Sequence, residues 1–452
     1  MPRRGVRVTA VALLCAATAA SQGARAAADF VPARVELALL LDGAQGVSGL
    51  RAFLGGVEQR APALAPGPQL AALVGPDLIA EPLSWGAAPA GARAIVLDAG
   101  AAGLTVPVLD ARAARSSLQS WLAEVGPPRT LRGSVPRGAL ASGDGRKMRA
   151  GLVASLGGAQ RLLTASGSEA ASLLAKLGKT AGRRTGAAPL SSDQTVRAAL
   201  ARLTGPAGLV VRGREPVRAA VLSLDGSAQG LVARGLLLAE APLLAGTAPA
   251  SSACAGAALL CVRAGLGPSG RTALGLLART WLAMLLDPAD REGADRLAQR
   301  AAAVAERLLV RSDGVDPRLL SGEYAPAWAA RLQAVTVPSA GDGRSDAQGP
   351  RSVCVRADAT AAWFGTPCPE APSADALASG ATTALDAQLE LGALDAALQR
   401  LTPLDALRGG LPAALYAARL TLGGMLRGSG PVVVTGQPHP AGAEVEARWP
   451  LR

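Results

Sequence analysis

The stretch from Arg34 to Gly43, which reads RVELALLLDG, decides the fold class. Its apolar run is closed by Asp42-Gly43, a turn signal, and so predicts a buried strand that ends at Asp42. Behind this strand, apolar residues at helical spacing predict an amphipathic helix: Val47, Leu50, Leu54 and Val57. The chain therefore opens with a strand followed at once by a helix.

Two later stretches resemble this opening. Val217 to Gly226 (VRAAVLSLDG) parallels it, but the second apolar run from Gly230 to Leu238 predicts a hairpin at this point. Asp386 to Leu394 again places a strand before a helix. The sequence predicts an α+β fold, mostly antiparallel sheet covered by helices, which duplicated strand-helix units could build. Chance similarity in a background rich in Ala, Leu and Gly is the alternative explanation of these resemblances to the opening stretch.

Further elements lie between these stretches. The runs Ala94–Leu97 and Leu104–Val108 predict a hairpin that turns through Asp98-Ala99-Gly100, and Asp110 then caps a helix. The remaining elements expected before residue 205 are a second strand pair and a helix: Gly151–Leu156, Arg161–Thr164 and Glu169–Leu177. With these elements, the chain is predicted to form a first α+β lobe over 29–205 and a second over 206–452.

The second lobe is expected to contain helices, a loop and a strand-rich end. Apolar spacing predicts helices over 271–286 and 287–308, the latter with Leu308 on its apolar face. The composition of Pro338 to Pro350 (PSAGDGRSDAQGP) predicts a flexible loop. Three strands are expected in the tail: Leu415–Leu422, Pro431–Thr435 and Glu444–Trp449.

The first 28 residues have the pattern of an export signal. Three arginines (Arg3, Arg4 and Arg7) precede an uncharged run from Thr9 to Ala20, and Ala-x-Ala sites follow before Asp29. The run is too short to span a bilayer. A periplasmic or secreted protein is predicted, with outer-membrane association, twin-arginine export and lipidation at Cys15 left as alternatives.

Cysteines support an oxidising compartment. Beyond the signal segment the chain keeps four: Cys254 and Cys261, Cys354 and Cys368. An even number of cysteines in an exported chain favours disulfides, and closeness in sequence favours these two pairs among the three connectivities.

Composition excludes several functions. The chain of 452 residues has no Asn and a single His, so a two-histidine metal site and any catalytic triad that needs Asn are ruled out. Its net charge of +12 would fall to +8 without residues 1–28, which hold four arginines and no acid. Basic residues concentrate in Arg129–Arg149 and in Lys176–Arg184, which could contact anionic lipid or an envelope polymer. No nucleic-acid partner is expected, and a solvated surface rich in arginine is the plainer explanation.

Catalytic motifs are weak. No Gly-x-Ser-x-Gly elbow occurs, His439 lies in an expected hairpin, and the stretch Leu177 to Thr180 (LGKT) lacks the earlier glycine of a P-loop. Four aspartates follow predicted strands: Asp42, Asp98, Asp110 and Asp225. Clustered at one sheet edge they could serve a carboxylate-dependent hydrolase or hold a cation, whereas turn and cap chemistry explains each separately. We therefore predict no catalytic residue, cofactor or metal.

The order of these features resembles exported bacterial proteins of a domain-of-unknown-function type. The residues that carry the resemblance are Phe30-Val31-Pro32 leading into RVELALLL, the AIVLDAG and VPVLDA pair, and LSLDG with its hairpin. The resemblance implies no agreed activity and supplies no catalytic residues. The sequence thus predicts a cell-envelope protein with a non-enzymatic binding or scaffolding role, and a periplasmic carboxylate-dependent hydrolase as the alternative.

Overall fold

The structure is a computed structural model of the chain. It describes residues 26–62, 72–75, 82–89, 91–133, 135–144, 147–156, 158–182, 188–249, 258–285, 299, 306–312, 347–348, 354–357, 361–366, 383–399, 401–403 and 410–452. The predicted signal segment up to residue 25 lies outside these residues.

The chain divides into two compact units. Unit 1 comprises Met1–Gln59, Leu64–Gly213 and Ala219–Gly235, and unit 2 comprises Arg60–Ala63, Arg214–Arg218 and Leu236–Arg452. Each contains a largely antiparallel sheet with helices, so the predicted α+β class is confirmed. The predicted lobe boundary at 205/206 stays a prediction.

Unit 1 contains nine strands in the described part of the chain. They are β1 (Leu37–Asp42), β2 (Ala92–Asp98), β3 (Ala101–Pro107), β4 (Arg129–Thr130), β5 (Leu140–Ser142), β6 (Arg149–Leu156), β7 (Ala159–Gly167), β8 (Ala207–Arg212) and β9 (Val217–Ser227). Their order across the sheet is β4-β5-β6-β7-β3-β2-β1-β8-β9, and each neighbouring pair is antiparallel. Two strands are divided between the units: the first two residues of β9 and the last part of β10 (Gly230–Ala239) belong to unit 2.

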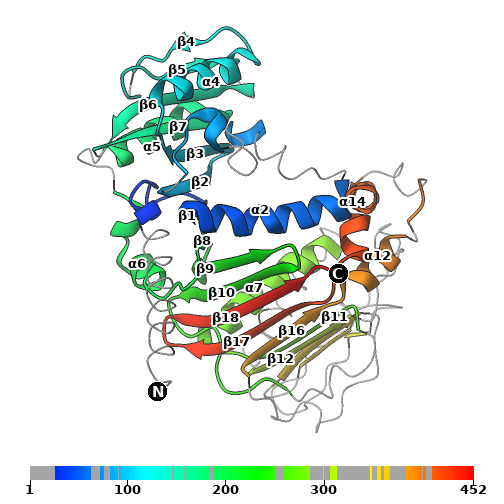
Figure 1. The fold of residues 1–452 in the computed structure, drawn as a ribbon. Helices are drawn as coiled ribbons and strands as arrows, with labels where there is room; N and C mark the ends of the chain where they lie inside the picture. Colours follow the sequence, from blue (N-terminus) through cyan, green and yellow to red (C-terminus); the bar gives the residue numbers. More distant parts are fainter. Residues whose placement is uncertain are drawn as a thin grey trace, which may run out of the picture. The chain divides into compact units, whose positions relative to one another are not determined.

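The described part of unit 1 also contains helices between its strands (Figure 1). They are α2 (Gly43–Arg60), η2 (Pro82–Trp85), α4 (Ala111–Ala123), α5 (Ala170–Ala181), η4 (Leu190–Ser192) and α6 (Gln194–Leu200). The predicted opening is confirmed, because Val47 of α2 packs with Leu41 of β1 and Ala207 of β8 in one buried cluster. Burial of this apolar helical face stabilises the strand-helix unit, since each large aliphatic side chain removed from water contributes about 1.5–3 kcal/mol.

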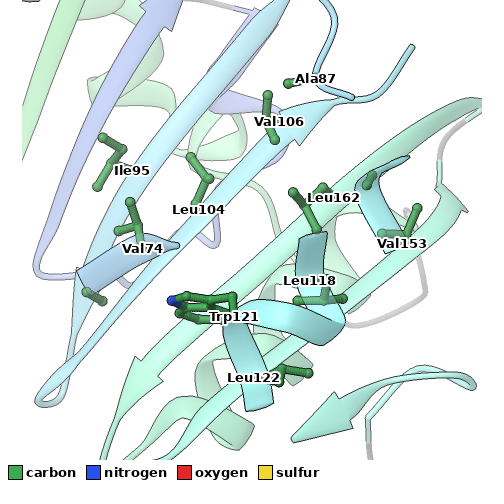
Figure 2. Close-up of a cluster of buried hydrophobic side chains, with 12 residues drawn as sticks. Val74, Ala87, Ile95, Leu104, Val106, Leu118, Trp121, Leu122, Val153 and Leu162 are labelled. Atoms are coloured by element: carbon green, nitrogen blue, oxygen red, sulfur yellow. The ribbon is translucent and has the colours of Figure 1, made fainter. Parts of the chain in front are cut away.

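Two helices cover opposite faces of the unit 1 sheet. A Cβ placed on Gly151 of β6 would lie 2.3 Å from Leu118 of α4, whereas one placed on Gly103 of β3 would lie 3.0 Å from Leu173 of α5. Leu104, the neighbour of Gly103 in β3, belongs to the cluster that includes Leu118 (Figure 2). Because successive residues of a strand point to opposite faces, α4 packs on one face of the sheet and α5 on the other.

The segment before β1 is anchored in unit 1. Arg161 of β7 is buried, with its guanidinium 3.6 Å from the centre of the Phe30 ring, and it donates hydrogen bonds to Thr105 Oγ1 (3.0 Å) and the Ala92 carbonyl (2.8 Å). Desolvation by burial lowers the pKa of Arg161 to about 10. The residues that directly follow the predicted signal segment are therefore part of the folded unit.

Unit 2 contains eight further strands in the described part of the chain. They are β11 (Leu260–Gly265), β12 (Arg307–Ser312), β13 (Ala347–Gln348), β14 (Cys354–Ala357), β15 (Ala361–Thr366), β16 (Leu385–Leu389), β17 (Val432–His439) and β18 (Gly442–Pro450). The order is β18-β17-β16-β11-β12-β15-β14-β13, antiparallel except for the parallel pair β12 and β15. Buried Arg263 of β11 pairs with Asp386, which stands directly opposite it on β16.

The tail of the chain corrects one prediction. Leu415–Leu422, expected to be a strand, lies inside the helix α14 (Gly410–Arg427). Tyr416, Leu422 and Leu426 of this helix join a cluster with residues of α12 (Leu391–Leu398). A mostly apolar stretch of eight residues fits either a strand or a helix face, and the continuation of the apolar residues to Leu426 favours the helix. The two other predicted tail strands are confirmed as β17 and β18.

Two helices and a loop were also predicted for unit 2, and the structure describes them to different extents. The helix expected over 271–286 is confirmed as α7 (Pro268–Leu285). Leu308, expected on the next helix, lies in β12, while most of that expected helix is outside the described residues. Within the expected loop 338–350, Ala347 and Gln348 pair with β14, and the rest is also outside the described residues.

Candidate functional site

A depression of about 560 Å³ lies at one end of the unit 1 sheet. The start of β1, the end of β2, the start of β3, the end of β7 and the start of β6 all meet there, as the strand registers require. Its lining comes from these strand ends, from residues 72–73, and from residues 125 and 147–148. A depression of this volume is within the range typical of ligand sites.

The lining exposes apolar side chains to solvent. Leu73 is 49% exposed and Leu97 is 39% exposed, and both line the depression. Leu73 is held in place by its backbone, because the hydroxyl of Ser166 on β7 donates a hydrogen bond to its carbonyl. Thr164 on the same strand donates in the same way to the carbonyl of Val74. The sheet thus fixes the backbone next to an apolar side chain that remains in water.

Two of the charged groups in the lining already have partners. Arg149 lies 2.5 Å from Glu124 at the C-terminal end of α4, and its guanidinium is 4.9 Å from the centre of the Trp121 ring. Asp98 Oδ2 accepts a hydrogen bond of 2.6 Å from Lys176 Nζ on α5. These pairs leave little net charge for a ligand to neutralise.

Two further charged groups also line the depression. Glu36 precedes β1 and Lys147 precedes β6, and both side chains are exposed. Neither takes part in an ion pair with any side chain that the structure describes. A single acid and a single base therefore stand at the two outer strands of the depression.

The turn at the rim of the depression is strained. Ala99, between β2 and β3, has a φ of +48°, and among the described residues no other non-glycine residue has a positive φ. The next residue, Gly100, has a φ of +79° and lines the depression. Residues held in such conformations concentrate at functional sites.

The four predicted aspartates do not gather at this site. Asp42 pairs in register with Ala92, whereas Leu37, at the other end of β1, pairs with Leu97. Asp42 and Asp98 therefore lie at opposite ends of the sheet, about 20 Å apart along the strands at roughly 3.4 Å per residue.

The other two aspartates lie at the same end as Asp42. Asp110 accepts hydrogen bonds from the backbone N–H groups of Arg112 (2.8 Å) and Ala113 (3.0 Å), and so caps α4 as predicted. Asp225 is exposed on β9, with β8 between it and β1. Of the four, Asp98 alone lines the depression. No two of these four aspartates therefore share the depression.

The cysteines are described in part. Cys261 is buried and disulfide-bonded. The side chains of Cys254, Cys354 and Cys368 lie outside the described residues, so the predicted pairing of Cys254 with Cys261 and of Cys354 with Cys368 stays a prediction.

The two basic segments meet in unit 1. A Cβ placed on Gly178 of α5 would lie 2.3 Å from Pro136, which follows β4, so the helix and this loop touch. The exposed basic residues of the two segments are Arg129, Arg132, Arg137, Lys147, Lys176 and Lys179. Binding of anionic lipid or an envelope polymer to them stays a prediction.

Two weak motifs have structural roles. His439 ends β17, where its Nδ1 accepts a hydrogen bond from the Ala441 N–H (3.2 Å) in the hairpin. Residues 177–180 are part of α5, so they form no phosphate-binding loop. Within the described residues no group of three His, Cys, Asp or Glu side chains could hold a metal ion.

Comparisons with protein families, curated proteins and solved structures found no match to this chain. The resemblance to exported bacterial proteins of a domain-of-unknown-function type stays a prediction. Among the described residues, no helix is long and apolar enough to cross a membrane.

Proposed function

We propose that the chain is an exported cell-envelope protein that binds or scaffolds a partner without catalysing a reaction. The observation that carries the proposal is the depression at the end of the unit 1 sheet, where Leu73 and Leu97 remain exposed. Exposed apolar side chains gathered in one concave site are typical of binding surfaces.

Features of the sequence support the envelope location. The arginine-rich start, the short apolar run and the Ala-x-Ala sites before Asp29 have the pattern of an export signal. A disulfide at Cys261 fits an oxidising compartment.

The proposal also includes an origin of the two units by duplication. In unit 1, β1 has antiparallel neighbours β2 and β8, and an 18-residue helix, α2, follows it. In unit 2, β11 has antiparallel neighbours β12 and β16, and an 18-residue helix, α7, follows it. By this topology β1 corresponds to β11, and the similarity of Val217–Gly226 and Asp386–Leu394 to the opening stretch stays a prediction. An experimental structure in which these elements fail to superpose would contradict the duplication.

Cell fractionation followed by native mass spectrometry tests the proposed function. The full chain is expressed with its first 28 residues and purified from the envelope fraction. We expect the processed chain in that fraction, with a species heavier than the free protein. Substitution Leu97→Gln should reduce the heavier species, whereas Leu109→Gln should not, because Leu109 is 75% exposed outside the depression. A cytoplasmic, unprocessed and entirely unbound protein would refute the proposal.

A further inference from the structure

The two ends of the depression carry opposite charges. Glu36 precedes β1, Lys147 precedes β6, and the order β1-β2-β3-β7-β6 places three strands between them. Four steps of about 4.8 Å between neighbouring strands separate the two outer positions by about 19 Å. The depression therefore runs across the strand ends from an acid to a base.

Apolar side chains line the middle of this path. Leu97 and Ala102 stand opposite each other on β2 and β3, and Leu73 lies beside Ser166 of β7. Asp98, which also lies along this path, already forms an ion pair with Lys176. An occupant thus meets one acid, an apolar stretch and one base in that order.

We propose that the depression binds an extended peptide segment of a partner protein, with an apolar middle, an acidic group near Lys147 and a basic group near Glu36. At about 3.3 Å per residue, a path of about 19 Å accommodates roughly six residues of extended chain. Opposite charges at the two ends complement Glu36 and Lys147. The inference names the partner class for the binding role proposed above.

Charge argues against other occupants. The hydrocarbon chain of a lipid with its headgroup at Lys147 would end against Glu36 and remove water from its carboxylate, which is unfavourable. An anionic polymer would be repelled by Glu36. A peptide with a base at one end and an acid at the other satisfies both groups.

Binding of synthetic hexapeptides to the purified full chain tests the inference. The probes are fluorescein-labelled, end-blocked peptides of sequence KLVALE, KLVALK, ELVALE and KSGSSE, followed by fluorescence anisotropy. The wild-type chain should bind KLVALE about fivefold more tightly than KLVALK or ELVALE, because each exposed charge pair contributes up to about 1 kcal/mol. It should bind KSGSSE weakest, because that peptide has no apolar middle.

Charge-reversal variants make the test specific to the site. Lys147→Glu should shift the preference to KLVALK, and Glu36→Lys should shift it to ELVALE. Both residues are exposed, and a misfolded variant could not gain a new preference. The matched control is Arg112→Glu on α4, which changes the same charge outside the depression and should leave the ranking as in the wild type.

Three results would overturn the inference. One is the same peptide ranking in all variants, the second is binding of none of the peptides, and the third is displacement of KLVALE by KSGSSE or by palmitate at equal concentration. The peptide assay uses purified protein and does not depend on export. Failure here with a bound lipid in the native mass spectrum would reject the peptide partner and leave the binding role standing.

Discussion

The strained turn between β2 and β3 allows a stabilising substitution, Ala99→Gly. Ala99 has a φ of +48°, a left-handed conformation that costs an L-residue about 1–2 kcal/mol. Glycine adopts it without that cost, although the added freedom of the unfolded chain offsets about 0.4–1 kcal/mol. We expect unit 1 to gain about 0.5–1 kcal/mol in free energy of unfolding.

Native-state hydrogen exchange measures this gain inside a chain of two units. Amides of β2, β3 and β7 should exchange about two- to fivefold more slowly in Ala99→Gly, since 1.4 kcal/mol corresponds to a factor of ten. The matched control is Ala101→Gly, two residues away in β3, where the alanine is buried with ordinary strand geometry. There the same change should destabilise by roughly 0.5–1 kcal/mol. Equal or faster exchange in Ala99→Gly, or equal effects of the two substitutions, would refute the strain argument.

The remaining predictions concern helix caps and packing. Burial alone would raise the pKa of Asp193, but hydrogen bonds from Arg212 and the backbone of α6, together with the attraction of Arg212, lower it below 3.8. The carboxylate therefore stabilises the fold above about pH 4 and loses this effect as the pH falls. Asp193→Ala should cost about 1 kcal/mol at pH 7 and less at pH 3 in urea titrations, and an equal cost at both would contradict the assignment. Asp110→Ala should lower the free energy of unfolding by about 1 kcal/mol in the same assay, and Asp110→Asn should lower it much less. No loss of stability in Asp110→Ala would show that the cap is unimportant. Gly151→Ala should cost about 1–3 kcal/mol by crowding buried Leu118, and less in a Leu118→Ala background; additive costs would argue against the contact.

Local patterns in the sequence were enough to predict several elements of the fold. The Asp98-Ala99-Gly100 turn between two apolar runs predicted the β2–β3 hairpin, because few residue combinations tolerate a tight reversal. Asp110 predicted the start of α4 by its capping chemistry. The run Leu415–Leu422 misled because short apolar runs fit strands and helices alike.

The candidate site was beyond the reach of these patterns. The depression is formed by residues from five strand ends, and the sequence does not state the strand order β1-β2-β3-β7-β6 that brings Glu36 and Lys147 to one edge. For the same reason the aspartates after strands could not be assigned to one end or the other. One signal of the site's position was Ala99, which occupies a turn position that favours glycine. Backbone strain of this kind concentrates near functional sites.

Hydrogen–deuterium exchange tests the central claim, that the depression is an occupied binding site, most directly. Full chain purified from the envelope is compared with the same protein after denaturation, removal of bound material and oxidative refolding. We predict slower exchange of residues 97–102 and 147–149 in the envelope form, with the difference lost in the stripped form. Identical exchange of these residues in both forms, or protection confined to other residues, would contradict the account.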